Sequence, residues 1–149
     1  MQRRPNARAT SEGGPSARSR VVLAWAPAVV YMACIWGLSS TSMMDFPIDA
    51  FPLRDKGVHT IEYGTLGLLL AHASFRTWPR HHPLRTGALA VLITVLWGLL
   101  DEIHQAFVPG RSPDVLDLLA DTMGAMVGTT ARYAARRAAR LGMAARSSR

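Results

Sequence analysis

The chain alternates between four long apolar blocks and short polar connections. The blocks cover residues 21–38, 57–75, 84–100 and 115–131, and each holds about 17–19 residues. At a helical rise of about 1.5 Å per residue, each block is roughly 26–29 Å long, close to the thickness of the hydrocarbon core of a bilayer. The pattern predicts an all-α membrane protein, a bundle of four transmembrane helices.

The two ends of the chain are basic and poor in apolar residues, so the mean hydropathy of the whole chain is only +0.11. We expect residues 1–20 to form a disordered N-terminal segment. Residues 21–131 form the predicted transmembrane domain. Residues 132–149 form a basic tail, predicted to be a helix on the inner leaflet that binds anionic lipid and not nucleic acid.

The distribution of charge predicts the orientation of the bundle. Fourteen of the 17 Lys and Arg residues fall before the first block, in residues 76–85 or in the tail, which are all on one side of a four-span topology. The positive-inside rule places this side in the cytoplasm, together with both termini. Nine of the ten acidic residues then lie at the outer side. We therefore expect a multi-pass protein of the cell membrane with an acidic outer face.

Three of the predicted helices carry polar side chains at this outer level. In the second block Asp55, His59 and Glu62 lie within about 60° of one another on one helix face. Because unpaired charges are costly inside a membrane, we expect a hydrogen-bonded cluster whose carboxylates pair with the available cations. The predicted members of this polar cluster are Asp55, Lys56, His59, Glu62, Tyr63, Asp101, Glu102, Gln105, Arg111, Asp117 and Asp121.

The start of the fourth block combines capping signals with a glycine motif. Ser112 is a predicted N-cap, with Pro113 at the first helical position. Gly124 and Gly128 follow on the face that carries Asp117 and Asp121, and small residues at this spacing let a neighbouring helix approach closely. This face is therefore predicted to pack against protein and not lipid.

The polar cluster alone leaves several roles open. It can hold the bundle together, bind an anionic or amphiphilic envelope molecule, serve a metal-dependent or acid/base enzyme, or conduct ions. His59 and Glu62 have the i, i+3 spacing of a metal pair, but this pair is common, and we assign neither a metal nor a cofactor. No Ser or Cys stands beside a base, which disfavours acyl transfer. The inner halves of the blocks carry few polar residues, which disfavours conduction.

The ordered set of motifs closely resembles the VanZ-like family of small bacterial membrane proteins, over about residues 21–131. The residues that carry this resemblance are Asp55-Lys56-x-x-His59-x-x-x-Tyr63, then Asp101-Glu102-x-x-Gln105-x-Phe107-x-Pro109-Gly110-Arg111, and then Asp117-x-x-x-Asp121-x-x-Gly124-x-x-x-Gly128.

The resemblance implies a helical transmembrane fold and a role in the cell envelope. The namesake of the family is linked to resistance to the glycopeptide teicoplanin. The implied partners are membrane lipid and a cell-wall precursor or another anionic envelope molecule, engaged without known catalysis; the oligomeric state stays open. One position departs from the pattern, because the family commonly has Asn where this chain has Asp121. An ionised Asp cannot donate a hydrogen bond, so we expect Asp121 to be protonated or paired with a cation.

Overall fold

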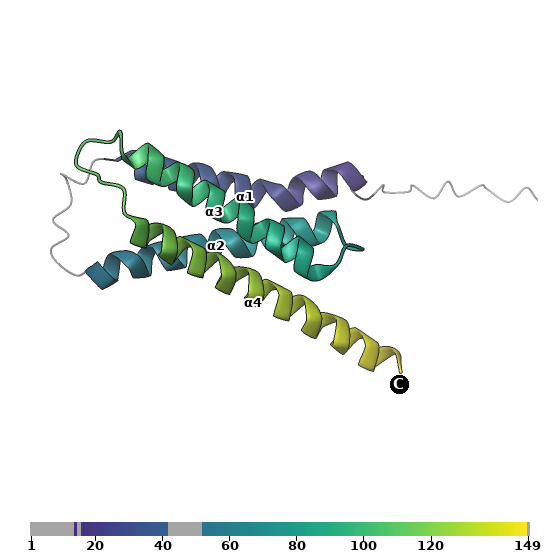
Figure 1. Cartoon of the computed structure of the whole chain (residues 1–149). Coiled ribbons are helices and arrows are strands. Elements are labelled where there is room, and N and C mark those ends of the chain that lie inside the picture. Colours follow the sequence, from purple (N-terminus) through teal and green to yellow (C-terminus); the bar gives the residue numbers. More distant parts are fainter. Residues whose placement is uncertain (1–13, 15, 42–51, 149) are drawn as a thin grey trace, which may run out of the picture.

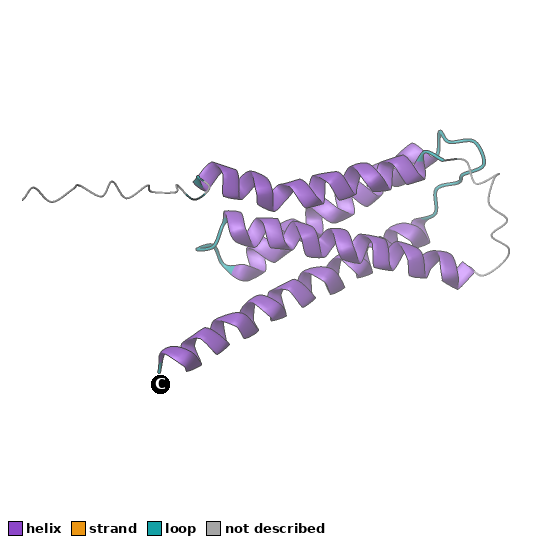
Figure 2. Cartoon of the chain, turned by 180° about the vertical axis from the view of Figure 1, so that it is seen from behind, coloured by secondary structure: helices purple, strands orange, loops and turns teal. Residues whose placement is uncertain are grey.

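The computed structural model describes residues 14, 16–41 and 52–148, with the side chains of residues 52–55 left out. This part of the chain forms four helices and no strand (Figures 1 and 2). The prediction of an all-α fold with four helices is confirmed. The helices are α1 (Ala17–Ser39), α2 (Pro52–Thr77), α3 (Pro83–Gln105) and α4 (Val115–Ser147).

The helix ends differ from the predicted ones in several places. Ser16 caps α1 by accepting a hydrogen bond from the Ser19 N–H, so the last residues of the predicted disordered segment are helical. The N-cap of α4 is Asp114, whose carboxylate accepts from the Leu116 N–H at 2.8 Å. The predicted Ser112 cap is therefore wrong, because the helix begins two residues later than Pro113.

The fourth helix is longer than its apolar block. It continues without a break through the basic tail to Ser147. In both ribbon views its C-terminal part runs on beyond the other three helices (Figures 1 and 2). The boundary predicted at residue 131 is thus a change of composition and not a helix end.

Helix α2 is the central element of the bundle. It packs against each of the other helices, whereas α1 and α4 have no contact with each other in the described part of the chain. Tyr63, Leu66 and Leu70 of α2 are almost fully buried, and they pack in one core cluster with Ile35 of α1 and Ala90 of α3. The packing of these apolar side chains therefore fixes the rotation of α2, and with it the helices that the polar residues of α2 face.

Glycines allow α2 and α4 to touch through their backbones. A Cβ added at Gly124 would overlap the carbonyl oxygen of Thr60, and one at Gly128 would overlap that of Gly64. On the α2 side, a Cβ at Gly67 would lie 2.7 Å from the Ala125 carbonyl oxygen. Any side chain at these positions would push the two helices apart, because Cβ atoms essentially never come so close to backbone atoms.

The outer surface of the bundle is apolar on every helix. Large apolar side chains are exposed throughout, among them Val29 of α1, Ile61 of α2, Leu96 of α3 and Met123 of α4. In the described part of the chain, α1 and α3 are the helices long and apolar enough to cross a membrane by length and composition. Helices α2 and α4 carry more polar residues, and their crossing of the membrane stays a prediction.

We expect Gly128→Ala to destabilise the bundle by about 1–3 kcal/mol, the usual cost of overpacking, because the added methyl group meets the α2 backbone. Thermal unfolding of the detergent-solubilised chain would measure this change. Gly37→Ala is the matched control, because a Cβ at this helical glycine has nothing within 4 Å. Equal stability of the two variants would contradict the close contact of α2 and α4.

Candidate functional site

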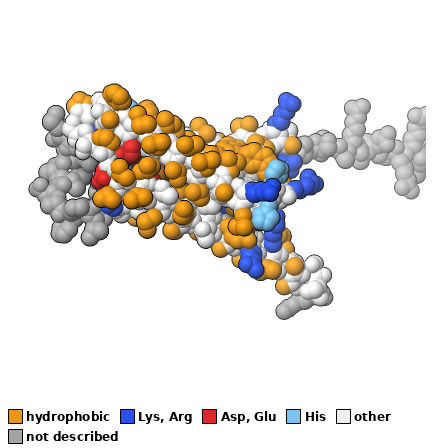
Figure 3. All heavy atoms as spheres, viewed as in Figure 1, with side chains coloured by type: hydrophobic (Ala, Val, Ile, Leu, Met, Phe, Trp, Pro, Cys, Tyr) orange, Lys and Arg blue, Asp and Glu red, His pale blue; other side chains and the backbone are white. Residues whose placement is uncertain are grey.

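The polar cluster lies at the end of the bundle where α1 and α3 finish and α2 and α4 begin. A space-filling view shows acidic side chains near this end and most of the basic ones at the other (Figure 3). All four helices take part, because hydrogen bonds join Ser39 of α1 to Asp101 of α3, and Lys56 and His59 of α2 to carboxylates of α4 or of its N-cap. The cluster is therefore an assembled site drawn from distant parts of the chain.

A series of ion pairs and hydrogen bonds runs inward between α2 and α4. The Lys56 ammonium donates to Asp114 at 2.6 Å and also to Asp117. One helical turn further along α2, His59 Nδ1 lies 3.0 Å from Asp121 Oδ1. The exposed fraction of the acidic side chains falls from 42% at Asp114 to 9% at Asp117 and 1% at Asp121. The series therefore leads from the surface into the dry interior of the bundle.

Asp114 has two roles at the outer edge of the cluster. Its carboxylate caps α4, where the helix dipole favours a negative charge, and it also accepts from Lys56. The Lys56 ammonium lowers the pKa of the Asp114 carboxyl below its ordinary value. This residue thus stays ionised at neutral pH and fixes the start of α4 relative to α2.

On the α3 side, the carboxylates are held by neutral donors. Asp101 Oδ2 accepts from the Ser39 hydroxyl at 2.7 Å and from the Gln105 amide at 2.9 Å. Glu102 Oε2 accepts from the Asp114 backbone N–H at 2.8 Å, which ties α3 to the connection that leads into α4. Neither carboxylate has a Lys or Arg within ion-pair distance among the described residues. Their charge is thus not compensated by a neighbouring cation.

Several buried polar atoms of the cluster have no hydrogen-bond partner among the described residues. Buried polar groups in proteins almost always have one, so these atoms are candidate contacts for a bound group. These atoms are Tyr63 Oη, Asp101 Oδ1, Glu102 Oε1, Arg111 Nε and Asp121 Oδ2. They come from all three of the helices that carry the predicted motifs and from the connection between α3 and α4, so these candidate contacts are a property of the assembled site.

The surroundings of Asp121 are shaped by a glycine and an aromatic ring. A Cβ at Gly98 would lie 2.8 Å from Asp121 Oδ2 and 3.1 Å from the Tyr63 ring, so only glycine leaves room for both. The rings of His59 and Tyr63 are nearly parallel, with their centroids 6.3 Å apart. Asp121 is therefore closely packed between Gly98 of α3 and Tyr63 of α2, and its Oδ1 lies 3.0 Å from His59 Nδ1.

Three of these residues have the arrangement of a metal site. His59, Glu102 and Asp121 are all buried, and each offers a ligand atom within 4.8 Å of those of the other two. One nitrogen and two carboxylate ligands suit a divalent transition-metal ion. Glu62, which the sequence spacing pairs with His59, is not part of this group in the described structure.

The structure brings together most residues of the predicted cluster. The predicted members that take part in its hydrogen bonds and ion pairs are Lys56, His59, Asp101, Glu102, Gln105, Asp117 and Asp121, with Tyr63 buried beside them. Glu62 is half-buried and has no hydrogen bond or ion pair with a described residue. The side chain of Asp55 lies outside the described residues.

Arg111 differs from its predicted role, because no carboxylate of the described chain lies within ion-pair distance of it. Three contributors were not predicted as site residues: Ser39, Gly98 and Asp114. The sequence pattern at Ser39 did not predict a site residue, because Ser39 is simply a polar residue at the end of an apolar block. Gly98 shares the helix face of Asp101 and could have been found from that spacing.

A comparison of the whole sequence with models of protein families identifies the same family that the ordered motifs of this site resemble. A family model described as VanZ/LLP1 matches residues 13–136. The chain belongs to the VanZ/LLP1 family. The matched region includes α1, α2, α3 and the part of α4 that packs in the bundle, and with them the whole polar cluster. Neither the search of curated proteins nor that of solved structures gave a match.

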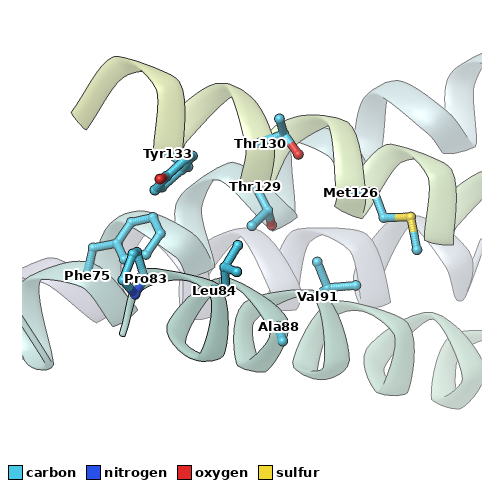
Figure 4. Close-up of a pocket in the computed structure, with 10 residues that line it drawn as sticks. Phe75, Pro83, Leu84, Ala88, Val91, Met126, Thr129, Thr130 and Tyr133 are labelled. Carbon is cyan, nitrogen blue, oxygen red and sulfur yellow. The ribbon is translucent and has the colours of Figure 1, made fainter. Parts of the chain in front are cut away.

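The surface of this VanZ/LLP1 chain is hollowed away from the polar cluster. A groove between α3 and α4 is lined largely by apolar side chains, among them Leu84, Val91, Met126 and Tyr133 (Figure 4). It lies toward the turn that joins α2 and α3, and its lining includes no carboxylate and no histidine. The carboxylates and histidines of the polar cluster therefore take no part in this groove.

We expect Lys56→Gln to lower the stability of the chain by about 1–3 kcal/mol, because it leaves the buried Asp117 carboxylate without its cation. Thermal unfolding in detergent would measure the change. Lys56→Arg keeps the charge and is the matched control. If the two variants unfold at the same temperature as the wild type, the ion pair between α2 and α4 does not stabilise the fold.

Proposed function

We propose that the chain is a four-span membrane protein of the cell envelope. Its polar cluster binds the polar headgroup of a lipid-linked or surface molecule. This binding lowers susceptibility to teicoplanin-type glycopeptides. The observation that carries this proposal is the set of buried polar atoms without partners at one end of an otherwise apolar bundle. Family membership supports a VanZ-like role.

The inside-out distribution of side chains supports four membrane crossings. Each helix exposes large apolar side chains, including the two helices that carry most of the cluster, as Ile61 and Val58 of α2 and Leu119 and Met123 of α4 illustrate. The buried side chains of the same helices include His59, Asp117 and Asp121. A soluble bundle would have the opposite arrangement, with polar residues outside. Lipid is the solvent that suits this surface.

The basic end of the bundle supports the orientation of the proposed topology. Fourteen of the 17 Lys and Arg residues belong to the N-terminal segment, the α2–α3 turn region and the C-terminal part. Contacts between Arg136 and the Pro79 carbonyl, and between Trp25 and Thr77, bring the C-terminal part of α4 and the first half of α1 to the α2–α3 turn region. With this end in the cytoplasm, the polar cluster opens toward the outside.

Cysteine labelling tests the orientation. In a Cys34→Ser background, we expect a membrane-impermeant maleimide added to intact cells to label Arg111→Cys, and to label Arg80→Cys only after the cells are opened. The physical reason is that the α3–α4 connection and the α2–α3 turn lie on opposite faces of the bilayer. Labelling of both positions from the same side would contradict the topology.

The donors and acceptors among the unpartnered atoms indicate the kind of headgroup that fits. The unpartnered atoms on Asp101, Glu102 and Asp121 are acceptors, whereas Arg111 Nε is a donor. A headgroup that presents both N–H or O–H donors and an anionic oxygen would satisfy both kinds. A lipid-linked molecule would also place its apolar part against the exposed surface of the helices. An amphiphilic envelope molecule with a polar, amide- or hydroxyl-bearing head is therefore the ligand that the site favours.

Substitutions at two residues of the cluster test the proposed role in glycopeptide resistance. We expect Arg111→Ala and Asp101→Asn each to reduce the glycopeptide resistance that the chain confers to the level of a deletion strain, because each removes a contact to the headgroup. Susceptibility tests with immunoblots of the membrane fraction would measure this. His82→Gln, at the exposed N-cap of α3, is the control. Full resistance in both variants would contradict the proposal, and loss of the protein itself would show that the cluster is only structural.

A further inference from the structure

We propose that His59, Glu102 and Asp121 bind one divalent transition-metal ion, of the Zn²⁺ or Mn²⁺ type, at the buried end of the polar cluster. The biological role of this ion rests on the proposed function, because it would sit where the headgroup binds. Ion binding itself is a property of the purified chain and is tested separately.

The three ligand atoms are already close enough to share an ion. They lie within 4.8 Å of one another and come from three different helices, α2, α3 and α4. His59 Nδ1 and Asp121 Oδ1 are 3.0 Å apart, which is the separation of two neighbouring ligands about 90° apart around an ion at about 2.1 Å. Ligands on opposite sides of such an ion would be about 4.2 Å apart. The spacing of the three ligand atoms is therefore close to that of ligands around one ion.

Two unpartnered oxygens give an independent reason for a ligand at this place. Glu102 Oε1 and Asp121 Oδ2 have no hydrogen-bond partner, and the exposed fractions of the two residues are only 6% and 1%. Burying a carboxylate oxygen without a donor or cation is costly. A metal ion bound between the two helices would supply the missing partner for both groups at once.

The local charge selects a cation over an anion. Lys56 is engaged by Asp114 and Asp117, and no Lys or Arg in the described part of the chain lies within ion-pair distance of Glu102 or Asp121. Two buried carboxylates beside one histidine would repel an anionic group at this depth. The anionic oxygen of a headgroup would therefore need Arg111 or the ion itself as its partner.

The set of ligands indicates the class of ion and its role. A nitrogen ligand disfavours Ca²⁺ and Mg²⁺, which take oxygen ligands, whereas imidazole with carboxylates suits Zn²⁺ or Mn²⁺. Three protein ligands leave at least one coordination position for an outside oxygen. On the other side of the imidazole, His59 Nε2 lies 3.9 Å from Asp117 Oδ2, which is within ion-pair distance but beyond hydrogen-bond distance.

Metal binding to the full chain tests the proposal directly. The chain would be purified in detergent with a tag free of histidine, stripped with a chelator, and titrated with Zn²⁺ and Mn²⁺ by calorimetry, with metal content measured by mass spectrometry. We expect one ion per chain, and at least about tenfold weaker binding for Glu102→Gln and Asp121→Asn. Absence of binding to the wild type, or unchanged binding in both variants, would overturn the proposal.

Two control variants separate the site from nonspecific binding. Asp114→Asn removes a carboxylate at the outer edge of the cluster but keeps a good N-cap for α4. His104→Gln removes a histidine at the same end of the bundle that stacks on Trp36. We expect both variants to bind one ion as the wild type does. A loss of binding in them equal to that of Glu102→Gln would show that the ion is held by the general acidity of this end.

A spectroscopic measurement covers the case in which the site variants fail to fold. The chain has five histidines, and replacing His72, His81, His82 and His104 by Gln leaves only His59. We expect pulsed electron paramagnetic resonance of this Mn²⁺-loaded variant to show nitrogen coupling from one imidazole. If the loaded wild type shows no nitrogen coupling, or the coupling disappears in the variant that keeps His59, the proposal is wrong.

The metal-binding and resistance measurements together separate the metal site from the proposed function. If the purified chain binds no ion while Arg111→Ala and Asp101→Asn still abolish resistance, the metal site is wrong and the headgroup binds without it. If one ion binds at His59, Glu102 and Asp121 while both variants keep full resistance, the metal site stands and the proposed function is wrong.

Discussion

The contact between the backbones of α2 and α4 is the constraint on which the site depends. With glycine at 64, 67, 124 and 128, the two helices approach until their main chains touch. At that separation the short side chain of Asp121 reaches His59, and Asp117 reaches Lys56. A single larger residue in this contact would increase the separation and break both interactions. In a membrane, where lipid competes equally for apolar surface, such close packing is a main source of helix association.

The same contact explains how an acidic cluster can exist inside an apolar bundle. The carboxylates are held in three different ways: by a cation at Asp114 and Asp117, by an imidazole at Asp121, and by neutral donors at Asp101. Each of these interactions joins two elements, so the cluster also fixes the register of the helices. At Asp101, Glu102 and Asp121 the fold uses one carboxylate oxygen, and the second oxygen is buried without a partner among the described residues. These second oxygens are the atoms that the proposed headgroup or ion would contact.

The fold was predictable from the sequence to a large extent, because helix periodicity and block length are local properties. The close approach at Gly124 and Gly128 also followed from spacing on one face. What could not be predicted were the interactions that depend on the depth and rotation of each helix. Ser39 reaches Asp101 only because α1 ends at the level where α3 ends. Arg111 was expected to pair with a carboxylate, but its position depends on the path of the α3–α4 connection, which no periodic pattern specifies.

The Asp121 position shows how one residue can change the chemistry of such a site. An asparagine, which the resemblance leads one to expect here, would fit beside Gly98 and could still hydrogen-bond to His59. It would bring no charge, however, and it would leave Glu102 as the single carboxylate of the proposed metal ligands. Aspartate adds a second anion at a depth where only 1% of the residue is exposed. An unpaired anion at this depth would be strongly destabilising, so this carboxyl group is either protonated or paired with a charged imidazole or a bound cation. Of these, a bound cation is the partner that would also contact Glu102 Oε1, the other buried oxygen of the proposed metal site.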